Sequence, residues 1–149
     1  MLLNDQKHTI LVAEDDPNDF MLLERALRKN SILNPLQLVR DGEETVAYLS
    51  GTGKYSNRKQ YPPPRFLILD LKMPRMGGLE VLEWLQNNRK FQVTPTLVLS
   101  SSRHDEDVQA AYRLGASSYL VKPSSFDDLQ TMIKVVYDYW AFCHRPEST

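Results

Sequence analysis

The chain has 149 residues, a hydrophobic fraction of 42% and a formal net charge of −1, values that suit one globular domain with an ordinary core. The near balance of acidic and basic residues argues against a general attraction to nucleic acid or to an anionic membrane. Because Cys143 is the only cysteine, an internal disulfide is excluded. No apolar run reaches the ~20 residues that a membrane span needs, and the sequence shows no recognisable signal peptide. We therefore expect a cytoplasmic protein with one domain over residues 1–149 and its core at about 9–142.

Short apolar runs alternate along the chain with longer segments whose apolar residues recur at helical spacing. The runs expected to form buried strands are 9–13, 36–39, 66–69, 96–99 and 119–121. The segments expected to form helices begin after Asp16 and then cover 43–49, 79–85, 105–114 and 125–142. Such alternation predicts an α/β fold, a doubly wound parallel sheet with helices on both faces.

The connection over residues 50–64 is unusually long, and its Pro-rich end at 61–64 is expected to be extended. Within it, Gly51-Thr52-Gly53-Lys54 faintly resembles a phosphate-binding loop. The spacing of that motif is absent and no helix follows, so we interpret these residues as a turn.

Polar side chains follow the predicted strands where each strand ends. Glu14 and Asp15 follow the first strand, Asp70 follows the third, Ser100 follows the fourth and Lys122 follows the fifth. The carboxyl ends of the strands share one edge of a doubly wound sheet, and the first and third strands are expected to be neighbours. Three carboxylates so close together repel one another, and an all-oxygen site of this kind favours Mg²⁺ as the compensating cation.

Asp70 is suited to attack phosphorus, because Mg²⁺ and the ammonium of Lys122 neutralise phosphoryl oxygens as the bond forms. The Ser100 hydroxyl can then hydrogen-bond one of those oxygens. Each residue taken singly also has an ordinary structural explanation. An acid after a strand often caps a helix, which is our interpretation of Asp16, and a lone Asp often belongs to a turn. Their combination at one sheet edge is what predicts a phosphoryl-transfer site.

The chain resembles the receiver domains of two-component signalling over about residues 9–140. The segments that carry the resemblance are ILVAEDD at 10–16, LILDLKMP at 67–74, VLSS at 98–101 and GASSYLVKP at 115–123. The resemblance implies a flavodoxin-like (βα)5 receiver fold with strand order 2-1-3-4-5. The residues after Val121 suffice for one helix and a tail, so we expect no output domain and a signal that leaves through protein contacts.

The resemblance also implies roles for the acidic residues. Asp70 would be the phosphoacceptor. Asp15, Asp70 and the backbone carbonyl of Lys72 would bind Mg²⁺ directly, and Glu14 would bind it through a water. Lys72 is an unusual residue at its position, and its side chain would flank the phosphoryl group.

A second set of implied roles concerns binding and switching. Lys122, Ser100 and Ser101 would contact the phosphoryl group, although Thr is commoner than Ser at the position of Ser100. Tyr119 would change rotamer with phosphorylation; the alternative is a strand aromatic whose hydroxyl faces solvent.

The long connection before the third strand and the short tail resemble the phytochrome-associated single-domain regulators of cyanobacteria. This narrower resemblance implies a light-sensing histidine kinase as phosphodonor. The downstream protein is not identified by the sequence.

The last predicted helix carries more apolar residues than one buried face needs. The stripe expected to face the core consists of Phe126, Leu129, Ile133, Val136 and Trp140. A neighbouring set consists of Met132, Val135, Tyr139 and Phe142. We expect this second set to form a homodimer or partner face; the alternative is a single wide stripe that is buried.

Three rival functions use similar residues. A haloacid-dehalogenase-like Mg-dependent phosphatase also needs Asp, Ser and Lys, but its nucleophile follows the first strand in a DxD arrangement. A flavodoxin-like binding module leaves the acid cluster and Lys122 unexplained. A degenerate receiver scaffold conflicts with the intact Asp70, Ser100 and Lys122. The remaining candidate ligands, His8, His104 and His144, are scattered and are interpreted as surface residues.

Overall fold

The computed structural model describes residues 7–91 and 94–143. Within them, five parallel strands form one sheet in the order β2-β1-β3-β4-β5. The strands are β1 (Ile10–Ala13), β2 (Leu36–Val39), β3 (Phe66–Leu69), β4 (Thr96–Ser100) and β5 (Ser118–Val121). Ala13 lies in register with both Val39 and Leu69, so the carboxyl ends of the three strands are level. The predicted fold class and strand order are confirmed.

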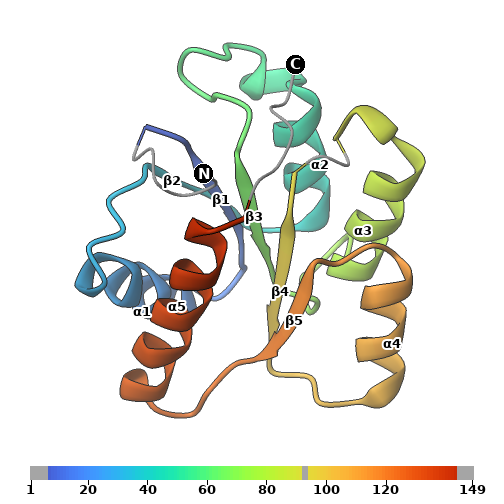
Figure 1. Cartoon of the computed structure of the whole chain (residues 1–149). Helices are drawn as coiled ribbons and strands as arrows, with labels where there is room; N and C mark the ends of the chain where they lie inside the picture. The colour runs from blue at the N-terminus through green and yellow to red at the C-terminus, as the bar shows by residue number, and fades with distance from the viewer. Residues whose placement is uncertain (1–6, 92–93, 144–149) are drawn as a thin grey trace.

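Helices cover both faces of the sheet (Figure 1). They are α1 (Pro17–Lys29), α2 (Gly42–Ser50), α3 (Gly78–Asn87), α4 (Asp105–Arg113) and α5 (Phe126–Ala141). Figure 1 shows α1 and α5 together on one face and α2, α3 and α4 on the other. Two short 3₁₀ helices, η1 (Gly53–Tyr55) and η2 (Arg89–Phe91), were not predicted. Among the described residues, no helix is both long enough and apolar enough to cross a membrane.

Side-chain caps fix the starts of three helices. The Asp16 carboxylate accepts hydrogen bonds from the backbone N–H groups of Asn18 and Asp19, which confirms Asp16 as the cap of α1. Asp41 caps α2 and Ser125 caps α5 in the same way.

Two glycines that directly precede the predicted helices at 43–49 and 79–85 are themselves the first helical residues. Gly42 is the first residue of α2, and Gly78 is the first residue of α3. A Cβ atom at Gly78 would lie 2.4 Å from the carbonyl oxygen of Asp70, closer than real Cβ contacts allow. The absence of a side chain therefore lets α3 start directly against the backbone that carries Asp70.

The long connection between α2 and β3 folds onto the domain. Gly51 ends α2 in the left-handed conformation, at φ +69°, and Gly53 and Lys54 belong to η1, so the turn predicted over residues 51–54 runs directly into a short 3₁₀ helix. The rings of Tyr48, Tyr55 and Tyr61 contact one another with centroid separations of 5.0–6.0 Å. Arg58 donates hydrogen bonds to the backbone carbonyls of Tyr48, Leu49 and Tyr55. This tyrosine cluster (Tyr48, Tyr55 and Tyr61) stabilises a segment that has little regular structure of its own.

Helix α5 confirms the predicted core stripe and divides the second set. Trp140 is only 3% exposed, and its ring lies against that of Phe66 with centroids 3.8 Å apart. In the second set, Val135, Tyr139 and Phe142 are 62%, 66% and 82% exposed. Met132 is partly buried and packs against the core, so it lies at the inner edge of this set. Its position beside Leu129 and Ile133 draws it inward.

The contrast between two aromatic residues of the last helical turns gives a stability prediction. Trp140→Ala should lower the free energy of unfolding by about 3–5 kcal/mol, because it removes a large side chain from a packed core. Phe142→Ala, at an exposed position, should change it by less than about 0.5 kcal/mol. Urea unfolding followed by circular dichroism measures both; equal losses would contradict the packing described for α5.

Candidate functional site

Three carboxylates meet at the carboxyl edge of the sheet. Glu14 and Asp15 directly follow β1, and Asp70 directly follows β3. The backbone N–H of Asp70 donates to the carbonyl of Ala13, so sheet hydrogen bonding continues past the strand ends and fixes these residues side by side. One carboxylate oxygen from each of the three lies within 4.8 Å of the others. Glu14 and Asp70 are buried and Asp15 is exposed.

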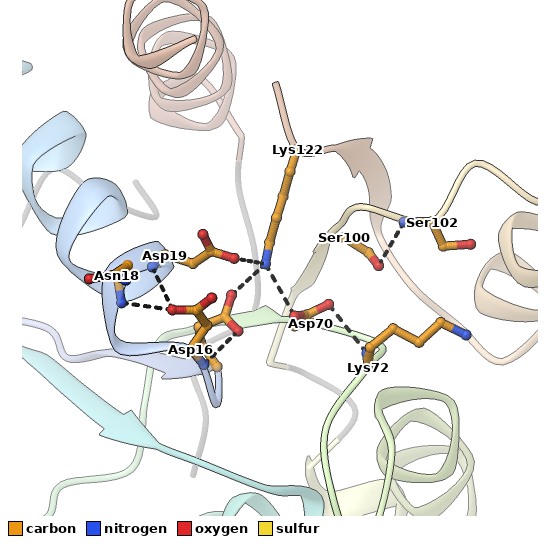
Figure 2. A network of polar contacts seen from close by, with 9 residues as sticks. Asp16, Asn18, Asp19, Asp70, Lys72, Ser100, Ser102 and Lys122 are labelled. Carbon is orange, nitrogen blue, oxygen red and sulfur yellow. Dashed lines mark hydrogen bonds and ion pairs between the residues drawn. The ribbon is translucent and has the colours of Figure 1, made fainter. Parts of the chain in front are cut away.

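Lys122 points into this cluster from the end of β5 (Figure 2). Its backbone N–H donates to the carbonyl of Ser100, which continues the pairing of β4 with β5. Its Nζ lies 2.6 Å from Glu14 Oε1, 2.8 Å from Asp19 Oδ2 and 3.2 Å from Asp70 Oδ2. Burial by itself lowers the pKa of Lys122, but the hydrogen bonds with Asp19 and Glu14 and the charge of Asp70 together raise it above its ordinary value. The ammonium therefore stays charged.

Glu14 experiences the opposite balance. The pKa of Glu14 is raised from 4.5 to about 7: burial is the largest cause, the hydrogen bond from Lys122 opposes it, and the charge of Asp70 adds to the rise. A carboxylate with this environment gains strongly from a further positive charge nearby.

The carboxylate cluster fits a divalent metal ion. Carboxylate oxygens are the ligands that hard divalent cations prefer, and the cluster offers one from each of three residues. The backbone N–H of Lys72 donates to Asp70 Oδ1 over 3.3 Å, which brings the backbone of residue 72 beside the cluster. Glu14, Asp15 and Asp70 could thus hold a cation that offsets their mutual repulsion.

The loop after β4 links Ser100 to Tyr119. Ser100 is fully buried, and its Oγ accepts a hydrogen bond from the backbone N–H of Ser102 over 3.3 Å. The Tyr119 hydroxyl donates to the carbonyl of Ser102 over 2.9 Å, so this hydroxyl is not simply in solvent. Ser101 is exposed. Sequence reasoning missed Ser102, whose contacts join the two predicted switch residues.

The side chain of Lys72 runs away from Asp70 (Figure 2). Its Nζ lies 3.6 Å from Asp107 Oδ2 on α4. The same carboxylate accepts a hydrogen bond from the Ser102 hydroxyl, and this bond, helped by the charge of Lys72, holds the pKa of Asp107 below its ordinary value. In this structure the unusual Lys72 side chain thus contacts α4 and not the phosphoacceptor candidate.

The loop between β3 and α3 is attached to the start of α2. Arg75, which has a φ of +65°, donates from Nε to Asp41 Oδ2 over 3.0 Å. The backbone N–H of Gly42 donates to the carbonyl of Met76 over 2.8 Å. These contacts, and the contact of Asp19 with Lys122, were not predicted. The position of Asp19 in the first turn of a helix that starts at the site could have indicated that its side chain lies near the acidic cluster.

Comparison with known proteins decides the family. The response regulator receiver domain matches residues 10–134. The chain belongs to this family. The response regulator Rcp1 of Synechocystis is 34% identical over 131 residues, which cover 88% of this chain and 87% of Rcp1. The probable methanogenesis regulatory protein FilR2 of Methanothrix harundinacea is 33% identical over 139 residues, 91% of this chain and 85% of FilR2.

Solved structures of relatives agree with the whole described fold. The phosphorylated cyanobacterial phytochrome response regulator RcpA matches with a TM-score of 0.86 and 29% identity, over 95% of this chain and 99% of that one. The Mn(2+)-bound form of Rcp1 matches with a TM-score of 0.83 and 31% identity, over 94% and 99%. The chain is thus a receiver-domain response regulator close to phytochrome response regulators, and its acidic cluster could bind a divalent metal.

The raised pKa of Glu14 predicts how the stability of the metal-free protein depends on pH. Because Glu14 binds its proton more tightly when folded, with a pKa of about 7 against 4.5, the free energy of unfolding should fall by about 1–3 kcal/mol as pH rises between these values. Glu14→Gln removes the titrating group and should reduce this slope.

Urea unfolding in EDTA at several pH values from 4.5 to 7.5 measures the effect. Glu43→Gln, at an exposed position in the first turn of α2, is the matched control and should keep the slope of the unmodified protein. An unchanged slope in Glu14→Gln would contradict the environment described for Glu14.

Proposed function

We propose that the chain is a single-domain response regulator that accepts a phosphoryl group on Asp70 from a histidine kinase and signals through protein contacts. The observation that carries the proposal is the position of Asp70. Its Oδ2 lies 3.2 Å from the ammonium of Lys122, and its carboxylate also belongs to the cluster that could hold a divalent ion. A carboxylate placed between two sites of positive charge is suited to attack a phosphoryl group.

In the proposed reaction an oxygen of Asp70 forms a bond to phosphorus while the N–P bond of the donor phosphohistidine breaks. The electron pair of that bond returns to the imidazole, and Asp70 becomes an acyl phosphate. Lys122 neutralises one phosphoryl oxygen. Mg²⁺ is the proposed cofactor, and when bound it would neutralise charge on the phosphoryl oxygens.

The residues proposed to hold Mg²⁺ are those of the acidic edge. Asp15, Asp70 and the backbone carbonyl of Lys72 would bind the ion directly, and Glu14 would bind it through a water. The oxygen-only donor set supports this assignment, since Mg²⁺ is bound by few protein ligands and retains several waters.

The proposed switch uses the loop after β4. The Ser100 hydroxyl would turn to a phosphoryl oxygen and give up the hydrogen bond from Ser102, with the exposed Ser101 moving alongside. The carbonyl of Ser102 also accepts a hydrogen bond from the Tyr119 hydroxyl, so a shift of this loop would change that bond and the position of the Tyr119 side chain on β5.

We propose a phytochrome-type light-sensing kinase as the phosphodonor. The likeness to Rcp1, and to RcpA in particular, supports this choice. The nearly equal identity to FilR2, a protein named for methanogenesis, means that the choice depends on a direct test of phosphotransfer.

The exposed side of α5 is the proposed partner face. Val135, Tyr139 and Phe142 expose apolar surface there, with Met132 at its inner edge. Aromatic residues of this kind are enriched in protein interfaces, so we propose that the face forms a homodimer or receives the downstream protein.

Phosphorylation is tested first with a small donor. After incubation with acetyl phosphate and Mg²⁺, intact-mass spectrometry should show one added phosphoryl group, absent from Asp70→Asn and absent in EDTA. Acetyl phosphate can replace the kinase as donor, because acetate leaves as the bond between Asp70 and phosphorus forms.

Two results would overturn the proposal. An adduct of equal yield in Asp70→Asn would place the phosphoryl group elsewhere. Rapid, sustained release of inorganic phosphate from a small phosphomonoester would instead indicate the phosphatase alternative.

A separate experiment tests the class of phosphodonor: phosphoryl transfer from an autophosphorylated phytochrome kinase is compared with transfer from an unrelated histidine kinase.

The partner face predicts a change of mass. Val135→Glu should reduce the molar mass measured by light scattering at micromolar concentration from that of a dimer to that of a monomer, because it places a charge in an apolar contact. Leu33→Glu, at an exposed position outside α5, is the matched control and should leave the mass unchanged. A monomeric mass for the unmodified protein, with and without phosphorylation, would rule out the homodimer.

A further inference from the structure

The three N–H donors of Lys122 are all engaged. An ammonium group has three donors, and Lys122 has a carboxylate oxygen within 3.2 Å for each of them, from Glu14, Asp19 and Asp70. The contact with Asp70 is the longest of the three. A phosphoryl oxygen that needs Lys122 must therefore compete with a carboxylate that already holds it.

Asp19 differs from the other two partners of Lys122. It does not belong to the group of carboxylates that could hold a metal ion. It lies in the first turn of α1, and its side chain is 39% exposed at the rim of the site. Figure 2 shows Lys122 extending between Asp19 on one side and Asp70 on the other. Asp19 thus forms an ion pair with the Lys122 ammonium, but it is neither a ligand of the proposed metal site nor the proposed nucleophile.

We propose that Asp19 is a positioning residue that competes with the phosphoryl group for Lys122 and thereby slows phosphorylation of Asp70. This inference rests on the proposed function. Two physical effects act in the same direction. Asp19 occupies one donor of Lys122, and its negative charge, close to that ammonium, repels an incoming phosphoryl dianion.

The size of the effect follows from the exposure of Asp19. A partly exposed ion pair has a modest strength, so Asp19→Asn should raise the initial rate of phosphorylation by about two- to five-fold. A merely structural role of Asp19 in α1 would give the opposite sign, since a disturbed helix start would misplace Lys122 and slow the reaction.

Asp16→Asn is the matched control. It removes one negative charge from the same helix end, and Asn caps a helix as well as Asp does. The Asp16 carboxylate accepts from the backbone N–H groups of Asn18 and Asp19 and has no contact with Lys122 among the described hydrogen bonds. Its effect should stay within about 1.5-fold, because an exposed charge without direct contact is screened.

The experiment measures the initial rate of phosphoryl incorporation from acetyl phosphate, at fixed Mg²⁺, by intact-mass spectrometry. Asp19→Asn should be faster than both the unmodified protein and Asp16→Asn, and Asp19→Glu should return the rate towards that of the unmodified protein. A rate for Asp19→Asn that equals or falls below that of Asp16→Asn would overturn the proposal. Failure of the unmodified protein to react at all would instead count against the proposed function.

A second measurement needs neither metal nor phosphoryl donor. In EDTA, Lys122 should be acylated faster by an amine-reactive reagent in Asp19→Asn than in Asp16→Asn, because one of its three carboxylate partners is gone. Peptide mass spectrometry reports the modification of Lys122, and the exposed Lys134 provides an internal reference. Equal modification of Lys122 in the two variants would show that Asp19 does not restrain it.

Discussion

The ion pairs of Lys122 hold together an edge of the sheet that would otherwise be driven apart by its own charge. Glu14, Asp19 and Asp70 all lie within 3.2 Å of one ammonium, and Asp15 adds a further carboxylate beside them. Burying like charges side by side is costly, and the raised pKa of Glu14 is the visible sign of that cost. The same excess of negative charge favours a divalent cation at this site. The free-energy cost of burying the carboxylates and the proposed chemistry therefore have the same cause.

The rest of the fold supplies the geometry that this charge arrangement needs. Strands β1 and β3 lie in register, and their hydrogen bonding continues to Asp70, so two acidic segments far apart in sequence are held at the spacing of a sheet. The loop after β3 is fixed from the other side by Arg75 on Asp41 and by Gly42 on Met76. These contacts limit how far the backbone at the acidic edge can move to relieve the repulsion.

Much of this arrangement could be predicted because it depends on periodicity and on position along the chain. Buried strands such as 66–69 are continuous apolar runs, and the parallel topology then places Asp70, Ser100 and Lys122 at one edge. Contacts between side chains that are far apart in the sequence could not be predicted, because they depend on the direction of each side chain. The contact of Lys122 with Asp19 spans 103 positions, and no local pattern distinguishes Asp19 from an ordinary acid in a first helical turn.

Two side-chain directions are set only in the folded protein. Met132 has the helical spacing of Val135 and Tyr139, but the position of α5 over the sheet brings it against the core. The side chain of Lys72 follows Asp70 by two positions, and its length allows it to reach Asp107 on α4. In both cases tertiary packing selected between directions that the sequence left open.

The start of α3 against the Asp70 carbonyl has a consequence for how the protein can evolve. The helix can approach so closely only where a hydrogen atom stands in place of a methyl group, since a Cβ at Gly78 would meet that carbonyl at 2.4 Å. Any other amino acid there would have to displace the main chain that carries the Asp70 carboxylate. A residue without a side chain thus restricts the set of viable sequences as firmly as the charged residues do, although it takes no part in the chemistry.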